Sequence, residues 1–233
     1  MIPTAEQLDE LFRSGAMERL GIGSRRACYA IPGTGLCVKC YRSEEEIALG
    51  KHVGYEPFKP LAAAVVREIR RHRASERNTS CQEWRYYNEL KGRLPAELAA
   101  AFPDVLERVF VPARGWCVVE NVICNHDGSP VRKFHEVLQD AAFKGDARKR
   151  DSLTAALDGL EDGLVRYAVR FYDPQNVMVQ WTAEDAFRLR IVDFEPATRS
   201  FIPLDSVLPA LVRRKVRRRF ARYREAFPHF FDS

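Results

Sequence analysis

The chain has 233 residues, of which 46% are hydrophobic and 30% are charged, and its formal net charge is +5. A chain of this length and composition is typical of a soluble globular protein with one large domain or two small lobes. No segment approaches the run of about 20 apolar residues that a membrane span requires, and charged side chains interrupt the N-terminus where a signal peptide would be apolar. We therefore expect a cytoplasmic protein without a transmembrane segment.

The first half of the chain is predicted to contain one helix, then strands, and then two further helices before the strands resume. Thr4 and Gln7 form a capping-box pattern that predicts a helix ending near Ser14. Residues 20–42 show two alternating stretches on either side of a turn at 32–35, which indicates a pair of strands. The remaining elements are helices over 60–77 and 80–90 and β-like runs over 105–111 and 116–123.

The second half is predicted to be mainly helical, with one hairpin. Helices are expected over 134–143 and 152–168, and the second carries an apolar stripe with helical spacing, formed by Leu153, Leu157, Leu160, Leu164 and Tyr167. Two short strands at 177–181 and 187–192 flank a turn. The C-terminal segment is predicted to be helical to about Phe227.

This order of elements predicts an α+β protein of two lobes that divide near residues 121–125. Residues 1–123 would form an N-terminal lobe with the first helix, a glycine-turn sheet and the helix that bears Glu83. Residues 124–233 would form a C-terminal lobe with the later helices, the hairpin and a basic terminal helix.

The six cysteines lie in or beside apolar segments, which favours reduced thiols that fill the core. Cys37 and Cys40 form a CxxC pattern, and a metal or redox role is its functional alternative. The pattern lies inside an alternating strand and has no second ligand pair, so core packing is the preferred interpretation.

Three features of the first lobe suit the phosphates of a nucleotide. Gly21 and Gly23 lie in LGIGSRRACYA, where glycines permit positive φ and a close approach of backbone amides to a polyphosphate; the alternative is an ordinary glycine-rich hairpin. Lys39 interrupts an apolar strand and is expected to hold the α- and β-phosphates, unless it extends to solvent. Glu83 lies beside the apolar stripe of the next helix, where it can pair with Lys39, unless it is a solvated surface residue.

Two oxygen-bearing side chains in the second lobe suit a magnesium ion. Asn176 precedes the predicted hairpin and Asp193 follows it, so the hairpin brings them near each other. Amide and carboxylate oxygens are ligands of Mg²⁺, which takes its remaining ligands from phosphate and water. The alternative for Asp193 is a simple turn residue.

The order of glycine turn, strand Lys, helix Glu, loop Asn, hairpin and strand-end Asp is that of the protein-kinase fold. Segments LGIGSRRACYA, CVKCYR, QEWRYYNEL, DPQNVMV and FIPL before a basic helix resemble the bacterial YrbL family, or PhoP regulatory network proteins, from about Leu20 to about Phe227. The resemblance implies a two-lobed protein-kinase-like fold with a reduced helical C-terminal lobe. It implies ATP and Mg²⁺ as ligands, and it assigns nucleotide-site positions to Lys39, Glu83, Asn176 and Asp193.

The chain departs from active kinases at the position of the catalytic acid. Phe171 stands five residues before Asn176, where kinases carry the Asp that accepts the substrate proton. Asp173 is the nearby carboxylate and the candidate catalytic substitute, although it is displaced by two residues. Glu195 replaces the glycine of the DFG-like triplet, and the short segment after Asp193 leaves little room for a protein-substrate platform.

Three functions remain open from the sequence. The first is a kinase-like protein that binds ATP and Mg²⁺, is inactive or weakly active, and regulates through an unknown small-molecule or protein partner. The second is an active phosphotransferase on a small molecule, sugar or lipid. The third is a binding module for an anionic membrane or nucleic acid, because residues 211–227 contain eight Arg or Lys and one Glu. A charged helix packed on the second lobe is the structural alternative for this segment.

Overall fold

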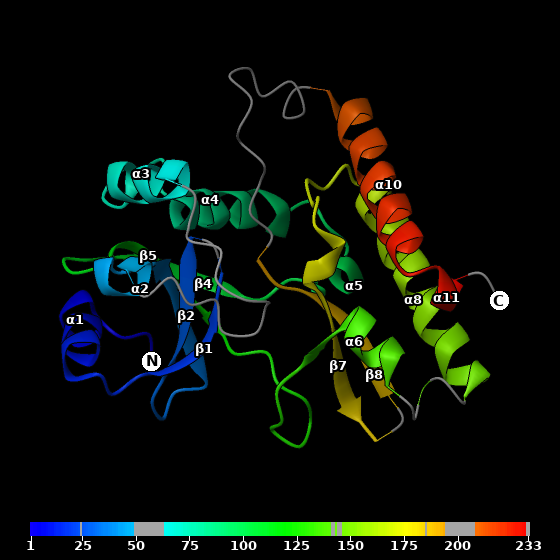
Figure 1. Cartoon of the computed structure of the whole chain (residues 1–233), viewed down its shortest axis with the longest axis horizontal. Coiled ribbons are helices and arrows are strands. Elements are labelled where there is room, and N and C mark those ends of the chain that lie inside the picture. The colour runs from blue at the N-terminus through cyan, green and yellow to red at the C-terminus, as the bar shows by residue number, and fades with distance from the viewer. Residues whose placement is uncertain are drawn as a thin grey trace. The chain divides into compact units, whose positions relative to one another are not determined.

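The computed structural model describes residues 1–23, 25–48, 63–140, 143, 146–184, 186–193 and 208–231. The chain has a mixed α+β architecture with antiparallel sheets (Figure 1). It divides into two compact units, and the break at Val122/Ile123 lies next to the lobe boundary expected from the sequence. Unit 1 contains Met1–Tyr87 and Asp104–Val122, and unit 2 contains Asn88–Pro103 and Ile123–Ser233, so residues 88–103 cluster with the second unit and not with the first.

Unit 1 is built around a five-stranded antiparallel sheet with the strand order β1-β2-β3-β5-β4. A turn at 32–35 joins its second and third strands, as predicted, and Gly33 and Gly35 adopt positive φ there. The sequence predicted two strands over 20–42, whereas the structure has three. The strands are β1 (Glu18–Ile22), β2 (Arg26–Ile31), β3 (Leu36–Tyr41), β4 (Val105–Val111) and β5 (Gly115–Asn121).

One face of this sheet forms an apolar core beneath helix α1 (Ala5–Ser14). Thr4 and Gln7 cap α1 with the predicted capping box, and Leu8 projects from the helix into the core with no exposed surface. The strand residues of this core alternate along each strand; they are Ala27, Tyr29, Ile31, Leu36, Val38, Cys40, Val111, Cys117 and Val119. Because side chains alternate across a strand, the residues between them belong to the opposite face.

The opposite face of the sheet meets helix α4 (Thr79–Lys91), which begins where Asn78 Oδ1 accepts a hydrogen bond of 2.8 Å from Ser80 N. Asn78 is therefore the capping residue, one position before the first residue of the helix. In the described part of the chain, the helices between β3 and α4 are α2 (Glu44–Ala48) and α3 (Ala63–His72). The predicted helix over 60–77 is thus shorter at its C-terminal end, and residues 60–62 lie outside the described part of the chain.

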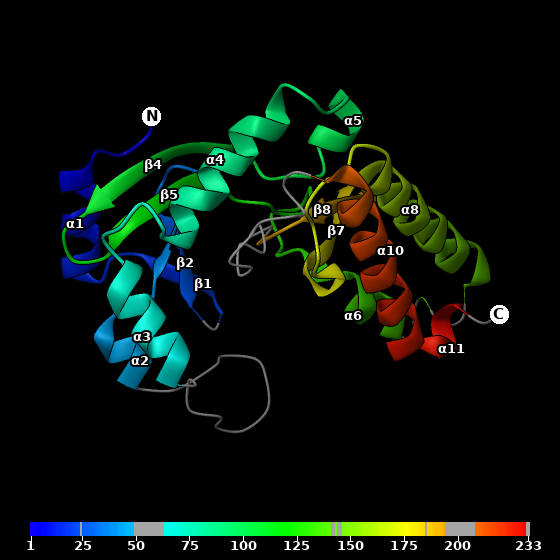
Figure 2. The ribbon, with the colours of Figure 1, turned by 90° about the horizontal axis from the view of Figure 1, so that it is seen from above.

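Unit 2 combines a three-stranded antiparallel sheet, in the order β6-β7-β8, with several helices. The predicted hairpin is present as β7 and β8, and α8 and α10 lie side by side in both views (Figures 1 and 2). No helix among the described residues has the length and apolarity needed to cross a membrane. The elements are α5 (Ala96–Ala99), β6 (Arg132–Lys133), α6 (Phe134–Gln139), α8 (Ala147–Arg166), η1 (Pro174–Asn176), β7 (Val177–Ala183), β8 (Ala186–Ile191), α10 (Pro209–Ala226) and α11 (Pro228–Phe231).

The packing of α8 and α10 buries one stripe of each helix. Leu153, Leu157, Leu160 and Leu164 of α8 are buried, as their spacing predicts, whereas Tyr167 follows the helix and is only partly buried. The buried residues of α10 are Val212, Val216, Phe220 and Tyr223. The basic helix is therefore a packed element of unit 2, as the structural alternative for this segment required.

Candidate functional site

Four charged side chains meet under α4 on the polar face of the unit 1 sheet. Arg26 comes from β2, Lys39 from β3, Glu120 from β5 and Glu83 from α4. Each residue is at most 8% exposed, and Glu83 has no exposed surface. The two cations and two anions balance, which is the condition under which buried charges are tolerated.

Lys39 lies between the two carboxylates of this cluster. Its Nζ is 2.7 Å from Glu120 Oε1 and 3.6 Å from Glu83 Oε1, so the Lys39–Glu83 pair expected from the sequence is present. The contact with Glu120 is an ion pair whose angles differ from those of an aligned hydrogen bond. Arg26 donates to Oε2 of Glu83 and completes the cluster. Glu83 is thus a buried ionic residue and not a solvated surface residue.

The cluster keeps Lys39 protonated. Burial opposes the charge of Lys39, but the Glu120 and Glu83 carboxylates outweigh it, and the pKa of Lys39 is raised above its ordinary value. For Glu120, burial raises the pKa, and the ammonium of Lys39 acts in the opposite direction. Lys39 is therefore a fixed positive charge that can bind an anion such as a phosphate oxygen.

The sequence predicted that Gly21 and Gly23 would adopt positive φ and admit a polyphosphate. Neither adopts a positive φ; Gly21 belongs to β1, next to the register shift between Arg19 and Gly21. Gly21 pairs with Cys28, and Cys28 pairs with Lys39, so the three residues form one row across the sheet. A Cβ atom at Gly21 would meet no atom within 4 Å. The glycine therefore leaves open space at the end of the row that contains Lys39.

The second group of predicted residues lies in unit 2, at the open end of the β7–β8 hairpin. Asn176 Nδ2 donates to the carbonyl oxygen of Asp193 at 3.4 Å, and Val192 N donates to Asn176 O at 3.0 Å. The hairpin brings Asn176 and Asp193 together, as its position in the sequence predicts. Asp193 adopts φ +55, a left-handed conformation that is uncommon for a residue other than glycine and that often marks functional positions.

Asp173 caps the short helix η1 by accepting from Gln175 N at 3.3 Å. Burial raises the pKa of Asp173, and the negative charge of Asp193 adds to the effect, whereas Arg219 and Lys133 oppose it. The two aspartates are therefore close enough to interact electrostatically, within a basic surrounding that includes α10. Such a carboxyl can hold a proton or, when ionised, serve as a ligand or a base.

Phe171 belongs to the core of unit 2. Its side chain is 1% exposed, and its ring centroid is 6.3 Å from that of Phe220 on α10. The position at which the comparison with kinases predicts a proton acceptor thus carries an apolar side chain that packs against α10. The predicted contributions of Glu195 and of the segment from 194 to 207 lie outside the described residues.

The two cysteines of the CxxC pattern do not face each other. Cys40 packs in the apolar core, whereas Cys37 lies on the opposite face of β3 and its Sγ is 3.8 Å from Glu120 Oε1. All six cysteines are free thiols, as expected. Cys37 lies close to Cys28, which pairing of β2 with β3 brings to the same face.

Sequence reasoning did not identify Glu120, Arg26 or Cys28 as members of the polar face. Glu120 stands in the apolar run WCVVEN in the same way that Lys39 stands in LCVKCY, so a lone charge within an alternating strand was the available signal. The pairing of Lys39 with Val118 and of Cys37 with Glu120 then determines which of these residues meet.

Comparison with known proteins agrees with the resemblance described from the sequence. The family model described as PhoP regulatory network protein YrbL matches residues 16–227. No curated protein matches the chain. Because the match covers nearly the whole chain, the protein belongs to this family.

Proposed function

We propose that this member of the YrbL family is a kinase-like protein that binds ATP with Mg²⁺ and acts mainly as a regulator, with weak or no phosphotransfer. The family description refers to a regulatory network, which fits a role through conformation or partners. Lys39 is the proposed ligand of the α- and β-phosphates, with Glu83 as its positioning partner. Asn176 and Asp193 are the proposed ligands of Mg²⁺, which, when bound, neutralises charge on the phosphate oxygens.

The proposal of nucleotide binding rests above all on the burial of Lys39. An isolated lysine in an apolar strand would cost several kcal/mol unless anions accompanied it, and Glu83 and Glu120 supply them here. A phosphate oxygen that took the place of Glu120 would leave Lys39 positioned by Glu83 alone. The open space above Gly21, in the same row, supports the approach of such a ligand.

Weak or absent catalysis is supported by the burial of Phe171, because an apolar core residue accepts no proton. The alternative of active phosphotransfer to a small molecule, sugar or lipid depends on Asp173. The raised pKa of Asp173 makes its carboxylate a stronger base than an ordinary aspartate, which is the observation that favours this alternative.

Thermal unfolding with and without nucleotide tests the proposal. ATP and Mg²⁺ at about 100 times the dissociation constant should stabilise the protein by about 2.7 kcal/mol, and ADP or another nucleotide serves for comparison. Asp193→Asn should reduce the shift, whereas Asp162→Asn, at an exposed position of α8, should leave it unchanged. The absence of a shift with every nucleotide would remove both the regulatory and the catalytic version of the proposal.

Turnover of ATP separates these two versions. Hydrolysis that disappears in Asp173→Asn but survives in Glu184→Gln, at the exposed end of β7–β8, would support the phosphotransferase. Nucleotide binding without turnover in the parent protein would support the regulatory version.

A second candidate function is contact with an anionic membrane or nucleic acid through α10. Its apolar stripe is buried, and six arginines are exposed on its remaining surface: Arg213, Arg214, Arg217, Arg218, Arg219 and Arg222. A surface of this kind binds phosphate groups by electrostatics, so binding to anionic vesicles or DNA should weaken as salt is added. Binding that is insensitive to salt would contradict this function.

A further inference from the structure

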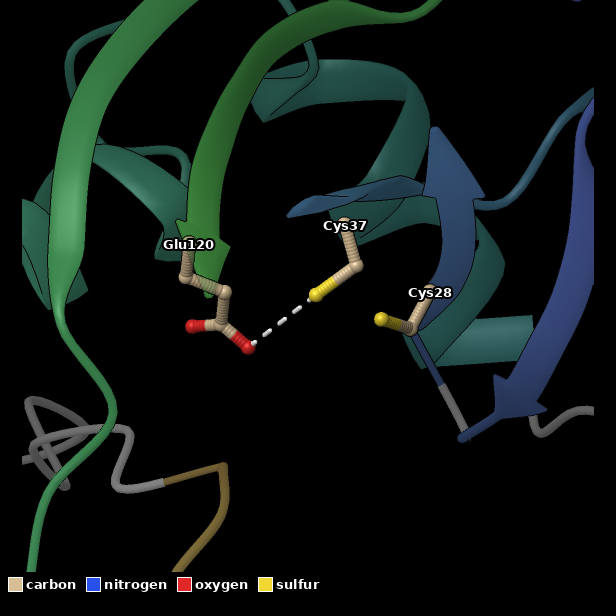
Figure 3. A group of neighbouring side chains, drawn as sticks. All are labelled: Cys28, Cys37 and Glu120. Carbon is tan, nitrogen blue, oxygen red and sulfur yellow. Dashed lines mark hydrogen bonds between the residues drawn. The ribbon is translucent and has the colours of Figure 1, made fainter. Parts of the chain in front are cut away.

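Three metal-ligating atoms converge beside Lys39 on the polar face of the unit 1 sheet. They are the Sγ atoms of Cys28 and Cys37 and a carboxylate oxygen of Glu120, and all lie within 4.8 Å of one another. Figure 3 shows the two thiols and the carboxylate directed toward the same space from β2, β3 and β5. The strand register brings them there: Cys37 pairs with Glu120, and Cys28 lies on the neighbouring strand.

The separation of Cys37 Sγ and Glu120 Oε1 is close to that of two ligands in a tetrahedral zinc centre. Bond lengths of about 2.3 Å to sulfur and about 2.0 Å to oxygen imply a sulfur–oxygen edge of about 3.5 Å and a sulfur–sulfur edge of about 3.8 Å. The observed separation of Cys37 Sγ and Glu120 Oε1 is 3.8 Å. A contraction of a few tenths of an ångström would therefore bring these two atoms to the separation expected for two ligands of one zinc ion, without a change of strand register.

The second carboxylate oxygen of Glu120 provides an independent indication of a ligand. Oε2 is buried and has no hydrogen-bond partner, although the residue is only 4% exposed. A buried acceptor without a partner destabilises the folded protein, and such groups require an explanation. A cation that the carboxylate binds through both of its oxygens, beside the two thiolates, would give Oε2 a partner.

Lys39 is compatible with a cation at this position. Two thiolates and the Glu120 carboxylate carry three negative charges, so a divalent ion leaves one negative charge in the centre. The ammonium of Lys39, 2.7 Å from Glu120 Oε1, would balance this charge and orient the ligating carboxylate. The half-buried position of Cys28 offers a route of entry from solvent.

We propose that Cys28, Cys37 and Glu120 form a binding site for one thiophilic divalent ion of the Zn²⁺ class. Thiolate ligands select soft or borderline metals over Mg²⁺ and Ca²⁺, and the carboxylate favours a divalent ion over a monovalent one. Three protein ligands leave a fourth position for water or another molecule, as in zinc centres that exchange ligands. The site is distinct from the proposed Mg²⁺ ligands Asn176 and Asp193, which lie in unit 2.

The test is a metal titration of the full chain, reduced, freed of metal with a chelator, and kept in a large excess of Mg²⁺ to occupy oxygen-rich sites. Zn²⁺ is titrated in competition with a chromophoric chelator, and Co²⁺ serves as a spectroscopic probe of thiolate ligation. We expect one Zn²⁺ per chain and thiolate-to-Co²⁺ charge-transfer absorption. Cys28→Ser and Cys37→Ser should each weaken Zn²⁺ binding by at least about tenfold, because even groups outside the ligand shell contribute this much.

Cys124→Ser is the matched control, because Cys124 is a half-buried thiol in unit 2, like Cys28 in unit 1. It should leave the stoichiometry, the affinity and the Co²⁺ spectrum unchanged. Thermal unfolding of the metal-free proteins checks that Cys28→Ser folds like the parent. Failure to bind stoichiometric Zn²⁺, a Co²⁺ spectrum without thiolate bands, or full binding by both the Cys28 and Cys37 variants would overturn the proposal.

Discussion

Replacement of Glu83 by glutamine removes one negative charge from the buried cluster of unit 1 while nearly preserving the side-chain volume. Arg26 and Lys39, whose side chains are 8% and 9% exposed, would then share Glu120 as their carboxylate in this cluster. Loss of one partner from a buried ion pair costs about 3 to 5 kcal/mol, because the remaining charge is desolvated without compensation. We expect the free energy of unfolding to decrease by about 3 kcal/mol, at the lower end of this range, since Glu120 still contacts Lys39.

For a chain of this length, that loss corresponds to a decrease in Tm of about 6 to 12 °C. Chemical denaturation followed by circular dichroism measures the free energy of unfolding directly. Glu89→Gln is the matched control on the same helix, because the Glu89 side chain is 51% exposed and meets Arg93 and Arg170 at the surface, at 2.8 and 3.5 Å. A surface ion pair contributes at most about 1 kcal/mol.

A double variant tests whether charge imbalance is the cause. Lys39→Met combined with Glu83→Gln removes one charge of each sign. The loss of unfolding free energy in the double variant should therefore be smaller than the sum of the losses in the two single variants by at least about 1 kcal/mol. Additive losses, or a Glu83→Gln variant as stable as Glu89→Gln, would refute the account of the cluster as a set of mutually compensating charges.

Two further predictions concern the backbone of unit 1 and the acid stability of unit 2. Gly115→Ala should lower the free energy of unfolding by about 1 to 3 kcal/mol more than Gly33→Ala does, as measured by denaturation. Both glycines have positive φ, but only a Cβ at Gly115 would overlap the carbonyl oxygen of Arg73. Equal losses in the two variants would contradict this steric explanation. Burial lowers the pKa of His135 from its ordinary 6.5, so the unfolded chain binds a proton more readily and stability should fall as pH decreases below about 6.5. His135→Phe should lessen this decrease, and an unchanged pH profile in that variant would show that other groups cause it.

Local patterns in the sequence were sufficient for much of the fold and for one half of the candidate site. The capping box of Thr4 and Gln7 located α1, and alternation in LCVKCY placed Lys39 on the face opposite the apolar core. The Lys39–Glu83 pair was predicted because Lys39 interrupts an apolar strand and Glu83 lies beside the apolar stripe of the next helix. These features depend on periodicities of two and about 3.6 residues, which are legible in a single segment.

The remaining site residues depend on contacts between segments far apart in the chain. Glu120 and Cys37 are 83 positions apart in the sequence, and only the pairing of β3 with β5 brings them together. The spacing of Cys37 and Cys40 suggested a pair, but an odd spacing places two strand residues on opposite faces. Strand register is a property of the whole sheet, so local reasoning did not identify the cluster of Cys28, Cys37 and Glu120.

The sharp division of the unit 1 sheet into an apolar and a charged face limits where its length can change. β2, β3 and β5 pair without register shifts, whereas the shifts lie in the outer strands β1, at Arg19/Gly21, and β4, at Val105/Glu107. An insertion of one residue before Lys39 within β3 would exchange the two faces and turn its ammonium into the core beneath α1. Insertions and deletions should therefore be tolerated at the edges of this sheet, while the three inner strands keep a constant length.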